Sequence, residues 1–400
     1  MLVRISRPRT SVTMGFGLQA PRKELLVSSA TAGLRGVIAG QSRICTVDGV
    51  EGKLVYQGYT ISDLAENSNF EEVVYLLWNG RLPTADELSS LRQEFCSAAA
   101  IPGSVIDLIR KFPPTAKPMD ALRTAVSALG MWDPDGADNS LAANRRKAGR
   151  LTAQMATIVT AIHRIRSGQE PIAPRADLSI AANFLYMLTG EEPSATAVRS
   201  FDVGLILHAD HELNASTFSA RVTIATLTDM YSAITSAIGT LAGPLHGGAN
   251  EGVLRMLLEI GTLESADAWI EEKLATKGAR VMGIGHAVYK TKDPRARHLE
   301  LMAKALAEES GNSVLYDISK KIETRMAEEK GLYPNVDFFS ATVYHVLGIP
   351  SDLFTPIFAV SRIAGWTAHV LEQLADNRLI RPRAEYVGPV DLKYLPIEQR

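Results

Sequence analysis

Cysteine is scarce in this sequence, where only Cys45 and Cys96 occur among 400 residues. Two cysteines speak against a disulfide framework and predict a reducing, cytoplasmic compartment. No apolar run approaches the ~20 residues that a membrane-spanning helix needs. Neither charge sign dominates, because the net charge is −2 and the pI is about 6.5. The composition therefore predicts no membrane partner and no nucleic-acid partner, and any anionic ligand must be bound by local arginines.

Acidic residues are missing from residues 1–23, which carry four arginines, three of them at Arg4, Arg7 and Arg9; the first acid is Glu24. This composition resembles an organellar transit peptide. The alternative is a disordered extension over residues 1–30, with Met14 as the true start and residues 1–13 outside the mature protein. We favour the second interpretation, and organellar targeting stays open.

Hydrophobic residues make up 46% of the chain, and most of them follow a helical pattern. Residues 144–166 place apolar side chains on one helical stripe, which predicts a core helix. Residues 221–243 are apolar nearly all round, which predicts one long buried helix. Thr84 and Glu87 have the spacing of a capping box at the start of another helix.

Strand patterns are confined to residues 43–61, where two glycine turns separate short β-prone runs and predict a small hairpin. The predicted fold is therefore all-α, with a small β-hairpin near the N-terminus. We expect a large helical domain over residues 31–250 plus 351–400 and a small helical domain over residues 251–350.

Four segments contain residues that packing in a hydrophobic core does not explain. They are HADHEL (208–213), GPLHGGANEGV (243–253) around His246, VMGIGHAVYKTKDPRA (281–296) and PNVDFF (334–339). Adjacent glycines beside His246 cost backbone entropy and leave little side chain to bury. These features indicate functional segments.

Each segment also has a simpler interpretation. A lone histidine is usually structural or solvated, and we assign that role to His208, His163, His298, His345 and His369. Asp337 is in a context typical of a helix N-cap. The H-x-x-H-E spacing of 208–212 allows a metal-dependent hydrolase, although it matches neither common zinc-helix motif and no cysteine accompanies it. We predict no metal.

Together the four segments supply histidines, one carboxylate in an apolar setting, arginines and glycine-rich backbone. This inventory suits proton abstraction next to a carbonyl, with the enolate held by hydrogen-bond donors. Arginines such as Arg295, Arg362 and Arg381 are suited to clamp carboxylates bidentately. The glycines of VMGIG allow backbone amides to approach a large anionic cofactor.

Five motifs in order, GPLHGGANE, GIGHAVYKTKDPR, PNVDFFSA, FTPIFAVSRIAGWTAH and IRP, resemble the citrate synthase family from about Gly33 to the C-terminus. The resemblance implies an α-helical homodimer whose active sites are shared and whose two domains close over the substrates. It implies condensation of acetyl-CoA with oxaloacetate and thioester hydrolysis, giving citrate and CoA. Acetyl-CoA is then a co-substrate, with no tightly bound cofactor.

The resemblance also implies roles for single residues. Asp337 is the expected base, His246 the donor to the thioester oxygen, and His286 the residue that polarises the keto carbonyl. Bare backbone at Gly247 and Gly248 is expected to let the thioester approach. The residues expected to bind oxaloacetate are His211, Arg295, Arg362 and, in the partner's site, Arg381; those expected to bind CoA are Val281, Met282, Gly283, Ile284 and Gly285.

Two positions depart from the family pattern, because many members have an aromatic residue at Ile284 and an arginine at Ala287. The alternative within the family is 2-methylcitrate synthase, which uses propionyl-CoA. Leu245 and the valine of PNVDF favour citrate synthase. The sequence leaves the acyl preference, allosteric regulation and oligomers beyond the dimer open.

Overall fold

The computed structural model describes residues 32–34, 36–276, 278–286 and 288–400. The predicted extension over residues 1–30 lies outside them. The chain forms two compact units. One joins the stretch up to Gln41 with Arg383–Arg400, and the other, Ser42–Pro382, contains every α-helix and strand of the described residues. The division near residues 250 and 350 stays a prediction.

The predicted all-α class is confirmed, because the described residues form sixteen α-helices and one small sheet. The α-helices are α1 (Ile61–Asn67), α2 (Phe70–Asn79), α3 (Ala85–Ala98), α4 (Gly103–Arg110), α5 (Pro118–Leu129), α6 (Leu141–Arg166), α7 (Ile180–Thr189), α8 (Ala195–His208), α9 (Ala215–Ile224), α10 (Met230–Leu241), α11 (Ala249–Ile260), α12 (Leu263–Ala275), α13 (Ala296–Ser310), α14 (Val314–Lys330), α15 (Val336–Val346) and α16 (Phe354–Ala375). Short 3-10 turns are η1 (Ala32–Leu34), η2 (Gly130–Trp132), η3 (Ser351–Leu353) and η4 (Ile397–Gln399).

The predicted hairpin is confirmed and gains a third strand. Strands β1 (Cys45–Asp48), β2 (Lys53–Tyr56) and β3 (Tyr59–Thr60) pair antiparallel in sequence order. The β1–β2 turn contacts a distant segment, since Lys290 N–H donates to Gly49 O at 2.7 Å. A Cβ on Gly49 would lie 2.3 Å from Val288 O, so only glycine permits this approach.

The capping box of α3 is also confirmed. Thr84 Oγ1 accepts from Glu87 N–H, and Glu87 Oε2 accepts from Thr84 N–H. These bonds satisfy two amide groups that a helix start leaves without partners.

The single helix predicted over residues 221–243 is wrong. The structure has two helices, α9 and α10, separated at residues 225–229. Asp229 starts α10 by accepting a hydrogen bond from Ser232 N–H, and Leu227 before it has a left-handed φ of 66°. An N-cap residue has non-helical backbone, so Asp229 interrupts a pattern that contains neither glycine nor proline there.

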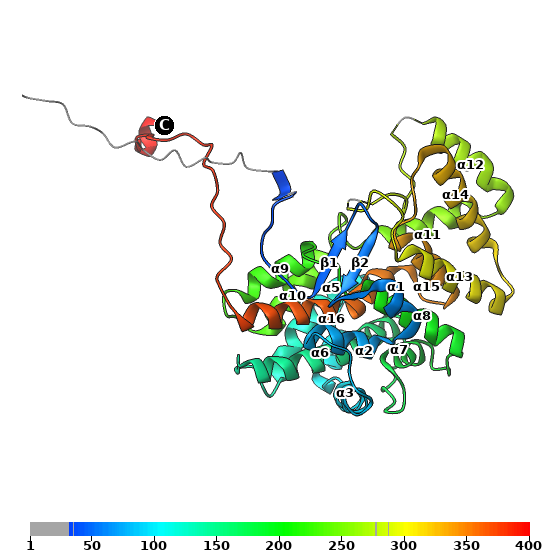
Figure 1. Ribbon diagram of the computed structural model, residues 1–400. Coiled ribbons are helices and arrows are strands. Elements are labelled where there is room, and N and C mark those ends of the chain that lie inside the picture. Colours follow the sequence, from blue (N-terminus) through cyan, green and yellow to red (C-terminus); the bar gives the residue numbers. More distant parts are fainter. Residues whose placement is uncertain (1–31, 35, 277, 287) are drawn as a thin grey trace, which may run out of the picture. The chain divides into compact units, whose positions relative to one another are not determined.

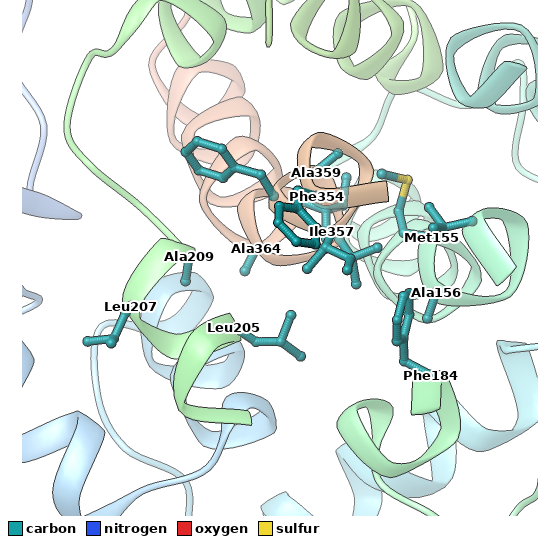
Figure 2. Close-up of a cluster of buried hydrophobic side chains, with 14 of the residues drawn as sticks. Met155, Ala156, Phe184, Leu205, Leu207, Ala209, Phe354, Ile357, Ala359 and Ala364 are labelled. Atoms are coloured by element: carbon teal, nitrogen blue, oxygen red, sulfur yellow. The ribbon is translucent and has the colours of Figure 1, made fainter. Parts of the chain in front are cut away.

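The core lies along α6 and α16. Helix α16 contacts α6, α9 and α10 (Figure 1). Met155 of α6, Phe184 of α7, Leu205 of α8 and Phe354 of α16 meet in one buried cluster (Figure 2). Among the described residues, no helix has the length and apolarity needed to cross a bilayer.

Candidate active site

His246 lies in the turn after α10 and faces the N-terminus of α9. Its Nε2 is 2.8 Å from Ser216 Oγ and 3.3 Å from Ser216 N. Trp366 of α16 donates to Ser216 Oγ at 3.1 Å, which fixes that hydroxyl. His246 therefore follows α10, the second of the two helices in the apolar stretch 221–243. Residues of α9 and α16 orient its ring.

The bond from Ser216 N–H decides which nitrogen of His246 carries the proton. A backbone amide only donates, so Nε2 accepts and the proton is on Nδ1. Burial, together with Arg362, lowers the pKa of His246 to about 4. The side chain is therefore a neutral donor at physiological pH, and Nδ1–H has no acceptor within the described residues.

His286 has the opposite tautomer. Its Nδ1 accepts from Val288 N at 3.0 Å and from Tyr289 N at 3.1 Å, so the proton is on Nε2. Burial and Arg295 lower its pKa to about 4. His286 thus presents a second neutral N–H, which has no acceptor in the described part of the chain.

His211 joins His286 around Tyr289. The centroids of the two imidazole rings are 5.6 Å apart, and His211 Nε2 is 3.3 Å from Tyr289 Oη. Burial and the positive charges of Arg295 and Arg362 hold the pKa of His211 well below its usual range. The HADHEL and VMGIGH segments therefore meet here, as the sequence analysis expected of one site.

Arg295 is buried and fixed by Asp293. Its Nε and Nη2 donate to the two Asp293 oxygens at 3.0 and 2.8 Å. Asp293 Oδ2 also accepts from Val336 N–H at 3.1 Å, at the start of α15. Nη1 of Arg295 has no hydrogen bond among the described residues, so it can bind a ligand.

Arg362 is 1% exposed and lies on α16. Its Nε donates to His208 O at 2.7 Å, and its guanidinium lies 4.6 Å from the centroid of the Phe358 ring. Within the described residues both Nη atoms are unpaired. Burial lowers the pKa of Arg362, although Asp210 opposes the shift.

Asp337 lies in the first turn of α15 and is not its cap. Asn335 caps this helix by accepting from Asp337 N–H at 2.9 Å, so the N-cap interpretation of Asp337 is wrong. The Asp337 carboxylate accepts no hydrogen bond from the described residues. Burial raises its pKa to about 6, against the opposing effect of Arg295. A carboxylate without donors and with this pKa is suited to act as a base near neutral pH.

The glycine loop 281–285 pairs with the segment that precedes Asp337. Gly285 N–H donates to Tyr333 O and Asn335 N–H to Gly283 O, both at 2.8 Å. Asn335 Nδ2 adds a bond to Gly285 O at 2.9 Å. Gly283 has φ of 76°, and a Cβ there would lie 2.7 Å from Val253. The loop and the start of α15 are thus joined directly.

Packing within the protein gives Gly247 a reason to lack a side chain that the sequence did not show. A Cβ there would lie 2.5 Å from Leu241 O and 2.9 Å from Thr355 Cγ2, so packing within the protein requires glycine. A Cβ at Gly248 would meet no protein atom within 4 Å. Room for a thioester beside Gly247 and Gly248 stays a prediction.

Some expected residues are not brought to this cluster. Arg381 is exposed in the extended segment after α16 and makes no hydrogen bond or ion pair within the described residues. The departure at Ala287 lies outside the described residues. His208 Nδ1 bonds Gly204 O of its own helix, and the described residues hold no group of three or more His, Cys, Asp or Glu arranged for a metal.

Sequence reasoning missed the residues that orient the others. Asp293 is two positions before Arg295 and Tyr289 three after His286, so local spacing gave a signal for both. Ser216 and Trp366 are 150 positions apart, and no spacing pattern connects them.

Comparisons with known proteins identify the family of this chain. The family described as "Citrate synthase, C-terminal domain" matches residues 33–383. "Citrate synthase 2" of Bacillus subtilis (strain 168) is 54% identical over 93% of this chain and all of its own length. A "2-methylcitrate synthase" of Shewanella oneidensis is 43% identical over 92% of this chain and 98% of its own.

Solved structures of the same kind match as well. Citrate synthase from Pyrobaculum aerophilum has a TM-score of 0.86 at 43% identity, covering 92% of this chain and 95% of its own. The second, from Thermoplasma acidophilum, is described as a ternary complex with carboxymethyl coenzyme A and oxaloacetate. Its TM-score is 0.84 at 35% identity, over 91% of this chain and 98% of its own. Together with the site geometry, the match of most of the chain and the level of identity show that the chain belongs to the citrate synthase family.

Proposed function

We propose that this protein condenses acetyl-CoA with oxaloacetate and water to give citrate and CoA. The observation that carries the proposal is a set of donors without partners in the described residues, together with the Asp337 carboxylate, which accepts no hydrogen bond there and has Arg295 and Arg362 as neighbouring positive charges. The donors are Nδ1–H of His246, Nε2–H of His286 and the free guanidinium nitrogens of Arg295 and Arg362. A keto dicarboxylate and a thioester offer acceptors for such donors, and Asp337 is the base.

The first step is enolisation of the acetyl group. Asp337 takes a proton from the methyl carbon while His246 Nδ1–H donates to the thioester oxygen, where negative charge develops. A neutral donor stabilises the enolate without adding a cation beside Asp337 that would lower its basicity.

The second step joins the two substrates. Arg295 and Arg362 hold oxaloacetate by its carboxylates, with His211 beside them, and His286 Nε2–H polarises the keto carbonyl. The enolate carbon attacks that carbonyl, and the new alkoxide takes the Nε2 proton of His286, which the proton held by Asp337 then replaces. Water then adds to the citryl thioester, the C–S bond breaks, and citrate and CoA leave.

The glycine loop is the proposed contact for CoA. The amides of Met282 and Gly283 have no partner within the described residues, whereas those of Ile284 and Gly285 bond Val281 O and Tyr333 O. Free amides at a glycine turn suit the approach of an anionic ligand.

We also propose a homodimer in which Arg381 completes the partner's oxaloacetate site. The exposed position of Arg381 and the exposed apolar side chains Met131, Trp132 and Leu245 support this arrangement. Mixing Arg381→Ala with Asp337→Asn subunits should restore activity in heterodimers. Inactive mixtures that demonstrably exchange subunits would contradict the shared site.

Release of CoA thiol tests the function. The purified protein should release thiol from acetyl-CoA only when oxaloacetate is present, and the product should be citrate. Propionyl-CoA in a parallel assay tests the alternative, 2-methylcitrate synthase; a higher kcat/KM for propionyl-CoA would establish it. Thiol release that does not depend on oxaloacetate would refute both. The domain division and the cytoplasmic location stay predictions.

A further inference from the structure

Each of the three residues before His211 is hydrogen-bonded to helix α16. Arg362 Nε bonds His208 O, Gly365 N bonds Ala209 O at 3.1 Å, and His369 bonds the Asp210 carboxylate. Positions 362, 365 and 369 recur at helical spacing and so lie on one face of α16. A Cβ on Gly365 would lie 2.4 Å from Asp210 Oδ1, which shows how closely the segment rests on the helix.

The contact between His369 and Asp210 is fully buried, since both side chains are 0% exposed. His369 Nε2 is 3.3 Å from the carboxylate. On the other side of the ring, Arg221 Nη1 lies 3.2 Å from Nδ1. Arginine only donates, so Nδ1 accepts and the ring proton is on Nε2, directed at Asp210.

Arg221 is itself fixed. Its Nη1 bonds Glu372 at 2.6 Å and its Nε bonds Gln373 at 3.1 Å, both on the last turn of α16. The tautomer of His369 is therefore set by a buried network and not by solvent. The earlier assignment of His369 as an isolated structural histidine is incomplete.

Asp210 connects His369 to the turn that contains His211. Its Oδ2 accepts from Glu212 N–H at 3.3 Å, closing a turn in which His211 is the central residue. Glu212 has φ of 56°, a left-handed conformation that a non-glycine residue adopts only when its surroundings hold it. Tyr56 Oη bonds the backbone N and O of Asp210 and so fixes the start of the turn.

We propose that His369 is a positioning residue for oxaloacetate binding. Through Asp210 it fixes the turn that directs His211 toward the substrate, without touching substrate itself. The inference rests on the proposed function, in which His211 binds oxaloacetate.

Two substitutions separate this role from general stability. His369→Gln places an amide N–H near the former Nε2 and can keep the bond to Asp210, whereas His369→Asn places it near Nδ1 and loses that bond. His163→Asn, at a half-buried histidine of α6, is the control for a histidine lost elsewhere. Calorimetry measures the Kd for oxaloacetate, and steady-state kinetics measure the KM for acetyl-CoA. Thermal unfolding shows whether each variant is folded.

We expect His369→Asn to weaken oxaloacetate binding about tenfold to a hundredfold, the range for a buried group that loses its partner. The KM for acetyl-CoA should not change, and His369→Gln should restore the Kd. An unchanged Kd in His369→Asn, or equal losses in the Gln and Asn variants, would overturn the proposal.

A second variant tests the same contact by changing Asp210 in place of His369. If His369→Asn does not fold, Asp210→Ser, which shortens the acceptor beyond reach of His369, should raise the same Kd; wild-type binding would overturn the proposal. If the wild-type protein neither binds oxaloacetate nor releases thiol, the proposed function itself fails, and this inference with it. Normal wild-type activity with an unaffected His369→Asn variant overturns only the inference.

Discussion

The two sides of the candidate site are held in different ways. On the oxaloacetate side, Arg362 lies on α16, and the segment before His211 is bonded to buried residues of that helix. On the acyl side, the loop 281–285 is held by backbone bonds to residues 333–335, and both segments are partly exposed. One side is built on a core helix and the other on paired loops.

This difference matches the two substrates. A site achieves specificity for a small dicarboxylate through fixed, desolvated hydrogen-bond donors, and these require a rigid support. A large CoA thioester must enter and leave, so its contacts fall on segments with fewer buried bonds. Asp337 lies where the two sides meet, because Asp293 connects the start of α15 to Arg295.

The largest expected effect follows from removing the base. Asp337→Asn keeps shape but loses the basic oxygen, so kcat should fall about 10²–10⁴-fold. Oxaloacetate binding, which relies on the arginines, should persist. Adding His246→Ala should cost little more, because residues that act as a unit are not additive. A single variant that retains more than about a tenth of wild-type kcat would contradict the role of Asp337.

The rigid side is tested by Arg362→Lys. Lysine keeps the charge but loses both the fork of donors and the Nε bond to His208 O. We expect oxaloacetate to bind about a hundredfold more weakly. Arg297→Lys, at an exposed position of α13, is the matched control. An Arg362→Lys variant that binds like the control would show that the fork is not used.

The pH dependence of kcat/KM tests the charge state of Asp337, which lies where the two sides meet. Asp337 works only when ionised, and its pKa is raised to about 6. The kcat/KM for acetyl-CoA should therefore be half-maximal near that pH and fall about tenfold per unit below it. His246 and His286, with pKa values of about 4, stay neutral over most of this range. An acid limb centred near pH 4 would point to the histidines and not to Asp337.

The loop-held side is tested at Asn335. Serine at this position retains a good N-cap for α15 but cannot reach Gly285 O. The KM for acetyl-CoA should rise about three- to tenfold, the value of one net hydrogen bond. The Kd for oxaloacetate should stay as in the wild type. Equal losses for both substrates would show that the two sides are not independently supported.

A stability measurement on the Asp337 variant gives an effect whose sign is opposite to that on activity. Because the folded-state pKa of Asp337 is raised, folding favours its protonated form, and ionisation costs stability as pH rises from about 4 to above 6. Asparagine cannot ionise, so Asp337→Asn should raise the free energy of unfolding by about 1–3 kcal/mol at pH 8. Near pH 3.5 the gain should disappear. Urea unfolding at both pH values decides the matter.

Local chemistry made much of the structure predictable. The hairpin, the capping box and the all-α class follow from turn residues, cap spacing and periodicity. Three of the four segments, HADHEL, VMGIGH and PNVDFF, are in contact in the structure. The sequence identified them because their glycines, histidines and carboxylates had no packing explanation. The roles of single residues came from the family resemblance and not from spacing.

Other features depend on contacts that no local pattern contains. The break at residues 225–229 depends on whether Asp229 caps a helix or lies inside one, and apolar periodicity favours the second. The pairing of Asp210 with His369 crosses 159 positions. Asn335, and not Asp337, is the helix cap, and its side chain also reaches Gly285 O, which the sequence alone does not show.

The contact between the β1–β2 turn and the segment after His286 also bears on how the chain folds. Gly49 and Lys290 are about 240 positions apart, so loop closure over that distance must precede the finished site. During synthesis the hairpin leaves the ribosome long before its partner segment exists. We expect the helical core to form first and substrate binding to appear late in refolding, since long-range contacts slow the folding of a chain.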